Sequence, residues 1–204
     1  MITIVDYGLG NIGAFANMFK RLNLSTAIAR APADLDGARH VVLPGVGAFD
    51  HAMQLLNSSG MRDTLDRLVR DGSVRVLGVC VGMQILADSS DEGVGSGLGW
   101  VPGRVRAFKG HPAASRLPLP HMGWNDVSET RTTPLLRGME QDARFYFLHS
   151  FYFDCADPAD AVAKAEYGFE FDCAVERPGV YGVQFHPEKS HHWGANLLRN
   201  FAGT

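Results

Sequence analysis

The sequence predicts an α/β fold built on an open, mostly parallel β-sheet, and two observations lead to this prediction. Short β-branched strands alternate with amphipathic helices through residues 1–87, as in successive βα units. After residue 88 the pattern changes, and apolar runs follow one another with few helices between them. These later runs indicate additional antiparallel strands in the C-terminal half. The length suits a single domain spanning residues 1–204.

The elements of the first half follow from apolar spacing. Continuous β-branched runs predict buried strands, and apolar residues three or four positions apart predict helices with one buried face. Phe15, Phe19 and Leu22 form such a face in the first helix. The expected strands lie at residues 2–5, 41–43 and 74–77, and the expected helices at residues 12–22, 50–56, 61–71 and 83–87.

The second half has strand-like runs and one clear helix. The segment 88–99 is polar and rich in glycine, and the basic stretch between Arg104 and Arg116 is typical of a solvated loop. Leu197, Leu198 and Phe201 form the apolar stripe of the final helix. The expected strands lie at residues 101–108, 145–153, 173–175 and 180–185, and the final helix at 193–201.

Charge and cysteine content exclude several classes of protein. The net charge of −3 predicts no attraction to nucleic acid or membrane. The chain has neither the roughly 20 consecutive apolar residues of a membrane span nor the features of a signal peptide. Three widely spaced cysteines form no disulfide framework, so we expect a reduced, cytoplasmic protein in which Cys155 and Cys173 pack in the interior.

Cys80 stands between a predicted strand and a predicted helix, with Gly78 and Gly82 two residues to either side. This is the spacing of a nucleophile elbow, a turn too tight for side chains at the flanking positions. A thiol at a helix N-terminus is more acidic, since the amide dipoles favour the thiolate. The sequence therefore predicts a nucleophilic cysteine, although a small buried cysteine in a tight turn would give the same pattern.

A second candidate group follows the predicted strand at residues 180–185. His186 ends this strand because Pro187 stops it, and Glu188 follows two residues later. The imidazole can take a proton from a thiol and return it to a leaving group, while the carboxylate orients the ring. The nearby His191 and His192 do not complete a metal-ligand pattern, so we expect no metal.

Two glycine-rich stretches in the first half leave alternatives open. Gly8, Gly10 and Gly13 match the G-x-G-x-x-G pattern of dinucleotide-binding proteins, and Asp34 lies about 20 residues further on. The other interpretation is a tight turn in which Asn11 caps the following helix. The loop Pro44–Phe49 could present N–H donors to an oxyanion, or could be a plain strand-to-helix turn.

Six motifs, in this order, resemble class I (triad) glutamine amidotransferases and, among them, the glutaminase subunits of imidazole glycerol phosphate synthase. They are Asp6-Tyr7-Gly8-x-Gly10-Asn11, Pro44–Phe49, Gly78–Gln84, Pro120–Asn125, His149–Tyr152 and Gln184–Ser190. The resemblance covers essentially the whole chain and implies a flavodoxin-like α/β fold with no cofactor. It also places the N-terminal glycines in a structural turn, which removes the dinucleotide interpretation.

The resemblance implies a role for each site residue. Cys80 would be the nucleophile, His186 the base and Glu188 its orienting acid, while the N–H of Val81 and one from Val46 or Gly47 would hold the oxyanion. L-Glutamine would be bound by Gly45, Gly82, Gln84, Glu92, Ser150 and Phe151. The implied partner is a (β/α)₈-barrel cyclase that receives ammonia through a shielded channel and forms a heterodimer with the glutaminase. Its interface would include His121, Trp124 and Asn125.

Some residues depart from the histidine-pathway subunits. Phe15, Trp100 and His191–Trp193 resemble instead a paralogous group that supplies ammonia for nucleotide-sugar synthesis in surface-polysaccharide pathways. A binding protein with an inactive triad is a further alternative, in which Cys80 would not react with a glutamine-like electrophile. We also expect the loop Pro44–Phe49 to hold its oxyanion donor turned away until a partner docks, which would limit wasteful hydrolysis.

Overall fold

The computed structural model describes residues 1–139 and 141–204. The N-terminal strands and one late strand form a parallel array. Their continuous apolar, β-branched runs are typical of parallel strands, which are buried on both faces. The neighbouring strands are, in order, β2 (Thr26–Ala29), β1 (Ile2–Val5), β3 (His40–Gly45), β4 (Arg75–Cys80) and β13 (Val180–Val183). This is the order of a flavodoxin-like sheet, in which ligands bind at the carboxyl ends of the strands.

The rest of the sheet is largely antiparallel, and the predicted combination of both kinds of pairing is confirmed. Beyond β13 follow β12 (Glu170–Arg177), β10 (Phe151–Cys155), β6 (Gly103–Ala107) and the short β5 (Ser89–Ser90). The strand predicted at residues 145–153 is in fact two strands, because the chain bends at Ser150. β11 (Ala161–Glu166) pairs with both β12 and the short β8 (Ser128–Glu129).

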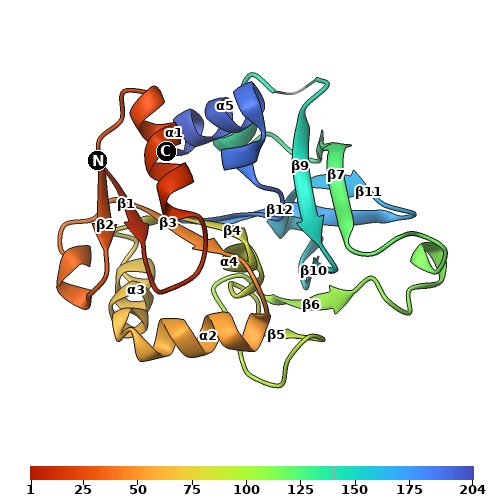
Figure 1. Ribbon diagram of the computed structural model, residues 1–204, viewed down its shortest axis with the longest axis horizontal. Helices are drawn as coiled ribbons and strands as arrows, with labels where there is room; N and C mark the ends of the chain where they lie inside the picture. Colours follow the sequence, from red (N-terminus) through yellow and green to blue (C-terminus); the bar gives the residue numbers. More distant parts are fainter. Residues whose placement is uncertain (140) are drawn as a thin grey trace.

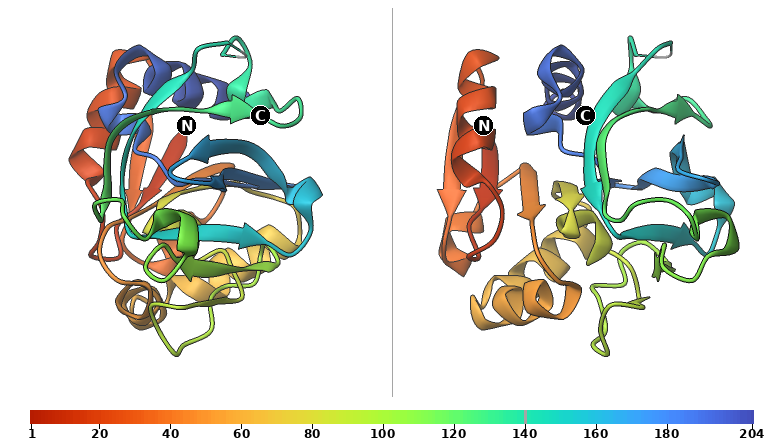
Figure 2. Two further views of the ribbon diagram at one scale, coloured as in Figure 1. Left: turned by 90° about the vertical axis from the view of Figure 1, so that its right-hand side faces the viewer. Right: turned by 45° about the vertical axis from the view of Figure 1, so that its right-hand side comes forward.

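A two-stranded antiparallel ribbon stands apart from this sheet. It consists of β7 (His121–Asp126) and β9 (Arg144–His149), paired from His121 opposite His149 to Asp126 opposite Arg144. Figure 2 shows the ribbon rising beside α5 (His191–Phe201) and away from β1 and β2. The ribbon therefore forms a wall next to the carboxyl ends of the parallel strands.

Helices cover the two faces of the parallel array. α1 (Ile12–Arg21) and α5 lie on one face, and α2 (Phe49–Ser58) and α3 (Met61–Arg70) lie on the other (Figure 1). The helix after the cysteine, α4 (Val81–Gln84), is a single turn, so the prediction that it extends to residue 87 was wrong. Among the described residues, we find no helix with the length and apolar character needed to cross a membrane.

The contacts of the N-terminal turn are structural. Asn11 caps α1, since its side-chain oxygen accepts a hydrogen bond of 3.0 Å from the N–H of Ala14. The Asp34 carboxylate accepts hydrogen bonds from the N–H groups of Arg30, at 2.8 Å, and Ala31, at 3.0 Å. These contacts hold the pKa of Asp34 below its usual value. The helix-cap interpretation is confirmed, and Asp34 closes a turn rather than reaching toward a ribose.

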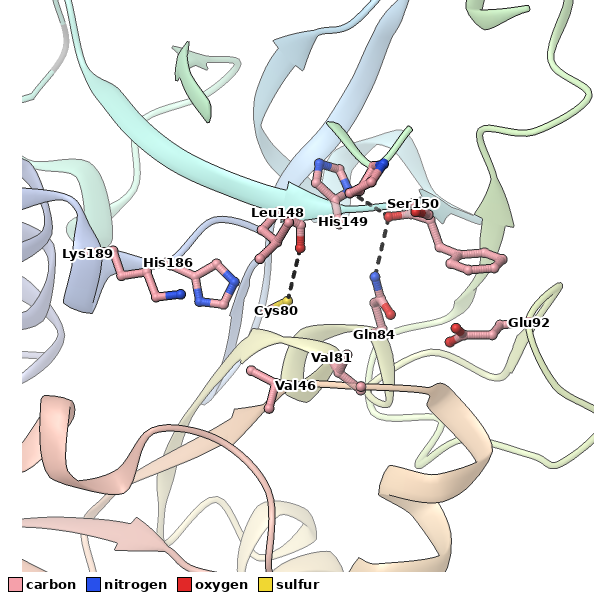
Figure 3. Close-up of a pocket in the computed structure, with 13 residues that line it drawn as sticks. Val46, Cys80, Val81, Gln84, Glu92, Leu148, His149, Ser150, His186 and Lys189 are labelled. Carbon is pink, nitrogen blue, oxygen red and sulfur yellow. Dashed lines mark hydrogen bonds between the residues drawn. The ribbon is translucent and has the colours of Figure 1, made fainter. Parts of the chain in front are cut away.

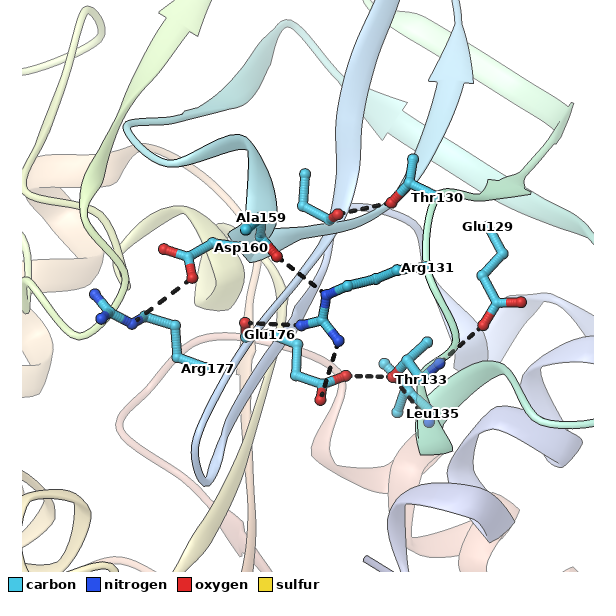
Figure 4. A network of polar contacts seen from close by, with 10 residues as sticks. Glu129, Thr130, Arg131, Thr133, Leu135, Ala159, Asp160, Glu176 and Arg177 are labelled. Carbon is cyan, nitrogen blue, oxygen red and sulfur yellow. Dashed lines mark hydrogen bonds and ion pairs between the residues drawn. The ribbon is translucent and has the colours of Figure 1, made fainter.

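A polar network ties the segment after β8 to the edge of the sheet (Figure 4). The Arg131 guanidinium donates to the carbonyl oxygens of Ala159 and Glu176 and pairs with the Glu176 carboxylate. The buried Thr133 hydroxyl donates a short hydrogen bond to that carboxylate, and the Thr133 N–H donates to Glu129. The network thereby anchors the segment that leads from β8 toward β9.

Candidate active site

Three neighbouring parallel strands bring the predicted catalytic groups to one edge of the sheet. β3 ends at Gly45, directly before the Val46–Gly47 loop, and β4 ends at Cys80. β13 pairs with β4 on its other side and ends three residues before His186. Although 106 positions separate residues 80 and 186, the topology places their side chains at the same cavity (Figure 3).

Cys80 has the strained backbone of a nucleophile elbow. Its φ of 56° and ψ of −114° lie in a region that non-glycine residues rarely adopt. A Cβ on Gly82 would lie 1.9 Å from the carbonyl oxygen of Leu43, and one on Gly78 would lie 2.4 Å from the carbonyl oxygen of Gly82. Both flanking positions therefore require glycine, and the turn presents the sulfur at the edge of the sheet.

His186 is oriented by Glu188. The ring Nδ1 lies 2.9 Å from Glu188 Oε1, and both side chains are only 3% exposed. Because a carboxylate can only accept, Nδ1 carries the proton and Nε2 is left for the sulfur, toward which the ring is turned (Figure 3). Burial lowers the pKa of His186, but the hydrogen bonds and negative charges of the Cys80 sulfur and Glu188 outweigh it and raise the pKa to about 9.

The cavity at this edge has a volume of about 260 Å³. Most of the predicted site residues line it, and they come from the β3 loop, the cysteine turn, the segment after β5, the bend between β9 and β10, and the end of β13. These residues are Val46, Gly47, Cys80, Val81, Gln84, Glu92, Ser150, Phe151 and His186. The cavity is therefore built from segments that are far apart in the sequence.

Gly45 and Gly82 have a different place from the one expected. They pack against each other, and a Cβ on Gly45 would lie 2.5 Å from the backbone nitrogen of Gly82. Both are buried in the junction between β3 and the cysteine turn. In this structure they let the two backbones approach closely, and their direct contact with substrate stays a prediction.

Comparison with known proteins agrees with this geometry. The family described as Glutamine amidotransferase class-I matches residues 3–203. The chain belongs to the class-I glutamine amidotransferase family.

Relatives of this amidotransferase share its full length. It is 60% identical to "Imidazole glycerol phosphate synthase subunit HisH" of Bdellovibrio bacteriovorus over 99% of both chains. It is 51% identical to the protein of the same name from Leptospira interrogans, again over 99% of both chains. A solved structure titled "Structure of PurLQS from Thermotoga maritima" has a TM-score of 0.74 at 17% identity, covering 99% of this chain and 97% of that one, which shows the shared fold.

Two side chains of the amidotransferase cavity are held by short polar contacts. Glu92 Oε2 accepts a hydrogen bond of 2.8 Å from the N–H of Phe49, which fixes the carboxylate at the cavity edge. The buried Gln84 Nε2 donates to Phe151 O at 3.3 Å and to Gln184 Oε1 at 3.0 Å. The two groups therefore stand in defined positions at the end of the cavity away from His186 (Figure 3).

The cavity also contains residues that sequence reasoning did not assign to the site: Pro120, Leu148, His149 and Lys189. Lys189 directly follows the His-Pro-Glu triplet, so its position in the motif was an available signal. Leu148 lies beside the nucleophile, since Cys80 Sγ is 3.9 Å from its carbonyl oxygen. Pro120 and His149 are the first residues of two of the six motifs, so the same signal was available for them.

The three residues expected at a partner interface differ in exposure. Trp124 is 41% exposed, and its ring stacks parallel to that of His191 with centroids 5.3 Å apart. Trp124 is therefore not a core residue. Asn125 is half-buried, and His121 is only 4% exposed, so its side chain faces the interior of the protein. We expected the His121 side chain to form part of the partner interface. Its burial contradicts this expectation.

The other two cysteines differ from Cys80 in their surroundings. Cys173 is fully buried within β12, and burial raises the pKa of its thiol well above the usual value. Burial and the neighbouring Asp172 carboxylate also raise the pKa of Cys155. Neither thiol forms a thiolate readily, which agrees with the prediction that both are packing residues.

Proposed function

We propose that this chain is the glutaminase subunit of an imidazole glycerol phosphate synthase. It would hydrolyse L-glutamine to glutamate and ammonia and pass the ammonia to a (β/α)₈-barrel cyclase in histidine biosynthesis. The observation that carries the proposal is the meeting of Cys80 and His186 at one cavity, with Glu188 bound to the His186 ring, in a chain that is 60% identical to a protein named as that subunit.

The first half of the reaction uses the thiol and the imidazole. His186, with its raised pKa, holds the thiol proton on Nε2, and Cys80 Sγ attacks the carboxamide carbon of glutamine as the thiolate. When the tetrahedral intermediate collapses, the C–N bond breaks and the same proton passes from His186 to the leaving nitrogen, which departs as ammonia. Glu188 keeps Nδ1 protonated throughout, so that Nε2 is always the nitrogen that exchanges the proton.

Water completes the cycle. His186 removes a proton from the water as it attacks the thioester carbon, and the C–S bond then breaks. The released thiolate and the protonated His186 ring restore the starting pair, and glutamate leaves as its carboxylate after the new carboxyl group loses a proton to solvent. Each turnover therefore consumes one glutamine and one water and yields one glutamate and one ammonia.

Both tetrahedral intermediates carry an oxyanion that needs N–H donors. The N–H of Val81 follows the nucleophile directly, and the Val46–Gly47 loop lines the same cavity beside it (Figure 3). Val46 is exposed, and Gly47 has a φ of 108°, where glycine can reorient at little steric cost. Loss of one oxyanion donor typically reduces the rate about 10²–10³-fold, so a loop that turns its donor away in the free subunit would suppress hydrolysis.

An exposed apolar surface beside the cavity fits a protein partner. Met122 is 64% exposed and neighbours Trp124 on the outer face of β7, while Leu119 and the cavity-lining Pro120 precede that strand. Contiguous apolar exposure of this kind is typical of a docking site. A cyclase covering it would close the cavity from solvent, which ammonia requires because free ammonia is protonated in water.

Reconstitution with the cyclase of the same organism tests the proposal. The complex should form imidazole glycerol phosphate with glutamine as nitrogen donor, and the isolated chain should hydrolyse glutamine at least about 10²-fold more slowly. The Cys80→Ala complex is the matched control, since it should lose the glutamine-dependent reaction but keep the reaction driven by added ammonium salt. Equal glutaminase rates with and without the cyclase would refute the loop hypothesis, and no glutamine-dependent product would refute the function.

One structural observation favours a second candidate, a glutaminase that serves nucleotide-sugar synthesis. His191, one of the residues that depart from histidine-pathway subunits, stacks on Trp124 in the surface proposed for the partner. A changed docking surface would mean a different ammonia acceptor with the same triad. Complementation of a histidine-requiring strain that lacks this subunit separates the two: growth supports the histidine pathway, and failure with intact glutaminase chemistry supports the second acceptor.

A further inference from the structure

Two buried histidines, His149 in the cavity wall and His121 next to it, form a hydrogen-bonded pair that the triad chemistry does not use. His121 Nδ1 lies 2.8 Å from His149 Nε2, and His149 Nδ1 lies 2.7 Å from the carbonyl oxygen of Phe151. On the other side, Asn125 Nδ2 lies 3.3 Å from His121 Nε2. The pair thus connects β7, at the proposed partner surface, with the main chain of the glutamine site.

The groups at the two ends of this hydrogen-bonded series fix the direction of every hydrogen bond in it. The carbonyl of Phe151 can only accept, so His149 Nδ1 is protonated and His149 Nε2 is an acceptor. His121 Nδ1 must then donate to it, which leaves His121 Nε2 as the acceptor for Asn125. The Asn125 amide fits this role, because its oxygen accepts from the N–H of Asp126 and its nitrogen also donates to the carbonyl of Glu166.

The surroundings keep both rings neutral. His121 is stacked between Phe147 and Tyr167, with centroids 4.8 and 4.1 Å away, and His149 is almost fully buried. Burial lowers the pKa of His121 to about 4 and that of His149 to about 3. At neutral pH each ring therefore has one donor and one acceptor, as the hydrogen-bond chain requires.

The same carbonyl connects the pair to the nucleophile. Phe151 O also accepts from Gln84 Nε2, which donates in addition to Gln184 Oε1. Gln184 Nε2 in turn lies 3.8 Å from Cys80 Sγ. A continuous series of donors and acceptors therefore runs from Asn125 to the sulfur, with the Phe151 carbonyl at its centre.

We propose that His121 and His149 are positioning residues for the glutamine site, which hold the Phe151 carbonyl, and through it Gln84, in the orientation that binds substrate. The proposal rests on the proposed glutaminase function of the same cavity. The two imidazoles touch neither the sulfur nor the reacting carbon, so their removal should weaken binding of a glutamine-like molecule more than it slows the chemical step.

Two substitutions at His149 separate positioning from packing. In His149→Asn, the side-chain amide nitrogen takes the place of Nδ1 and keeps the donor to the Phe151 carbonyl. In His149→Gln, the end of the side chain takes the place of Nε2, which keeps a partner for His121 but loses that donor. The probe is 6-diazo-5-oxo-L-norleucine, whose labelling of Cys80 is followed by mass spectrometry against reagent concentration in the full chain.

We expect the half-saturating concentration of the reagent to rise about three- to tenfold in His149→Gln and less than twofold in His149→Asn. The limiting labelling rate should change by less than a factor of two or three in both. If the two variants bind the reagent equally well, the positioning role is wrong. If the wild-type chain is not labelled at Cys80 at all, the proposed function itself fails, so the two failures are distinguishable.

Nitrogen NMR of the wild-type protein tests the order of donors and acceptors directly. Long-range ¹H–¹⁵N spectra at pH 7 should show His121 and His149 as neutral rings protonated at Nδ1, whereas free histidine favours protonation at Nε2. In Asn125→Ala, both rings should keep this form because the Phe151 carbonyl still fixes it, and only the ¹⁵N shift of His121 Nε2 should change. A wild-type spectrum with either ring protonated at Nε2 would overturn the proposal, whatever the folding of the variants.

Discussion

The two sides of the cavity are held in place by different forces. On the side of the parallel strands, backbone contact decides the geometry, since Gly82 lies against the carbonyl of Leu43 and Cys80 has a positive φ. On the side of the β7–β9 ribbon, hydrogen bonds between buried side chains such as His121 and His149 decide it. The first side tolerates almost no added atom, and the second depends on which nitrogen carries each proton.

The largest expected effect is that of a substitution at Glu188. Its carboxylate accepts a hydrogen bond from the His186 ring and orients that ring at the carboxyl ends of the parallel strands. Glu188→Gln removes the charge that favours the protonated ring, and its amide can also donate to Nδ1, which allows the opposite tautomer of the ring. We expect kcat for glutamine hydrolysis to fall about 10²–10⁴-fold and the pKa of His186 to fall below its value of about 9.

Steady-state kinetics of the reconstituted complex and a pH titration of the His186 ring by NMR measure these two changes. Glu170→Gln is the matched control, because this exposed glutamate at the start of β12 should leave kcat unchanged. An unchanged kcat in Glu188→Gln would show that backbone geometry alone orients the catalytic groups.

Gly82→Ala tests the steric side. Its Cβ would meet the carbonyl oxygen of Leu43 at 1.9 Å, so the two backbones must separate. We expect the free energy of unfolding, measured by urea denaturation, to fall by about 3 kcal/mol or more. Gly13→Ala is the control, since the nearest atom is 4.0 Å away and alanine favours the helix α1 by up to about 1 kcal/mol. Equal stability of the two variants would contradict the steric account.

Acid should lower the free energy of unfolding through the two buried histidines of the ribbon side. The folded pKa values of His121 and His149, about 4 and about 3, lie below the ordinary value of 6.5. Between pH 6.5 and 4 the unfolded chain therefore binds protons that the folded chain excludes, and stability decreases as the pH falls. Each ring contributes up to about 1.4 kcal/mol per pH unit in this window.

Denaturation curves from pH 4 to 7 measure this slope, and His149→Asn provides the comparison because it removes one titrating ring and keeps the hydrogen bond to Phe151. The slope should be shallower in the variant. Identical slopes would show that His149 is protonated normally in the folded protein, which would contradict its burial as a neutral ring.

The smallest effect is expected from the ion pair between Arg144 and Asp126, at the end of the ribbon. The side chains are 2.6 Å apart but 55% and 75% exposed, so solvent screens the pair. Arg144→Ala should change the free energy of unfolding by no more than about 0.5 kcal/mol in urea denaturation. A loss above about 1.5 kcal/mol would mean that surface charge, and not the buried hydrogen bonds, holds the ribbon.

The sequence predicts the two sides of the cavity unequally well. On the parallel side, β1 matches its predicted range, β3 extends the predicted one at both ends, and β4 begins one residue later and ends three residues later than predicted. Strands covered on both faces read as continuous apolar runs, which makes them visible in the sequence. The glycines at the cysteine turn are also visible, since a steric requirement selects one residue type. The order of the strands, which brings His186 to Cys80, follows from the fold that the motifs imply and not from spacing alone.

β7 shows why the ribbon side was less predictable. Its inward-facing residues His121 and Asn125 are polar, while the outward-facing Met122 and Trp124 are apolar and exposed. This pattern is the reverse of an ordinary half-buried strand, so hydrophobicity gives no sign of which face is inside. The edge strand β2 is also only partly buried, and its short mixed pattern was not recognised as a strand. The functional interior of the ribbon depends on cross-strand pairs, which a single sequence does not display.

Selective labelling of one thiol tests the central claim most directly. The full chain is incubated with 6-diazo-5-oxo-L-norleucine at neutral pH, with and without excess glutamine, and digested for mass spectrometry. The account predicts a single adduct on Cys80, slowed by glutamine and absent in Cys80→Ala, with Cys155 and Cys173 unmodified. An unmodified Cys80, or equal labelling of all three thiols regardless of glutamine, would contradict a glutaminase site in which His186 and Glu188 activate this sulfur.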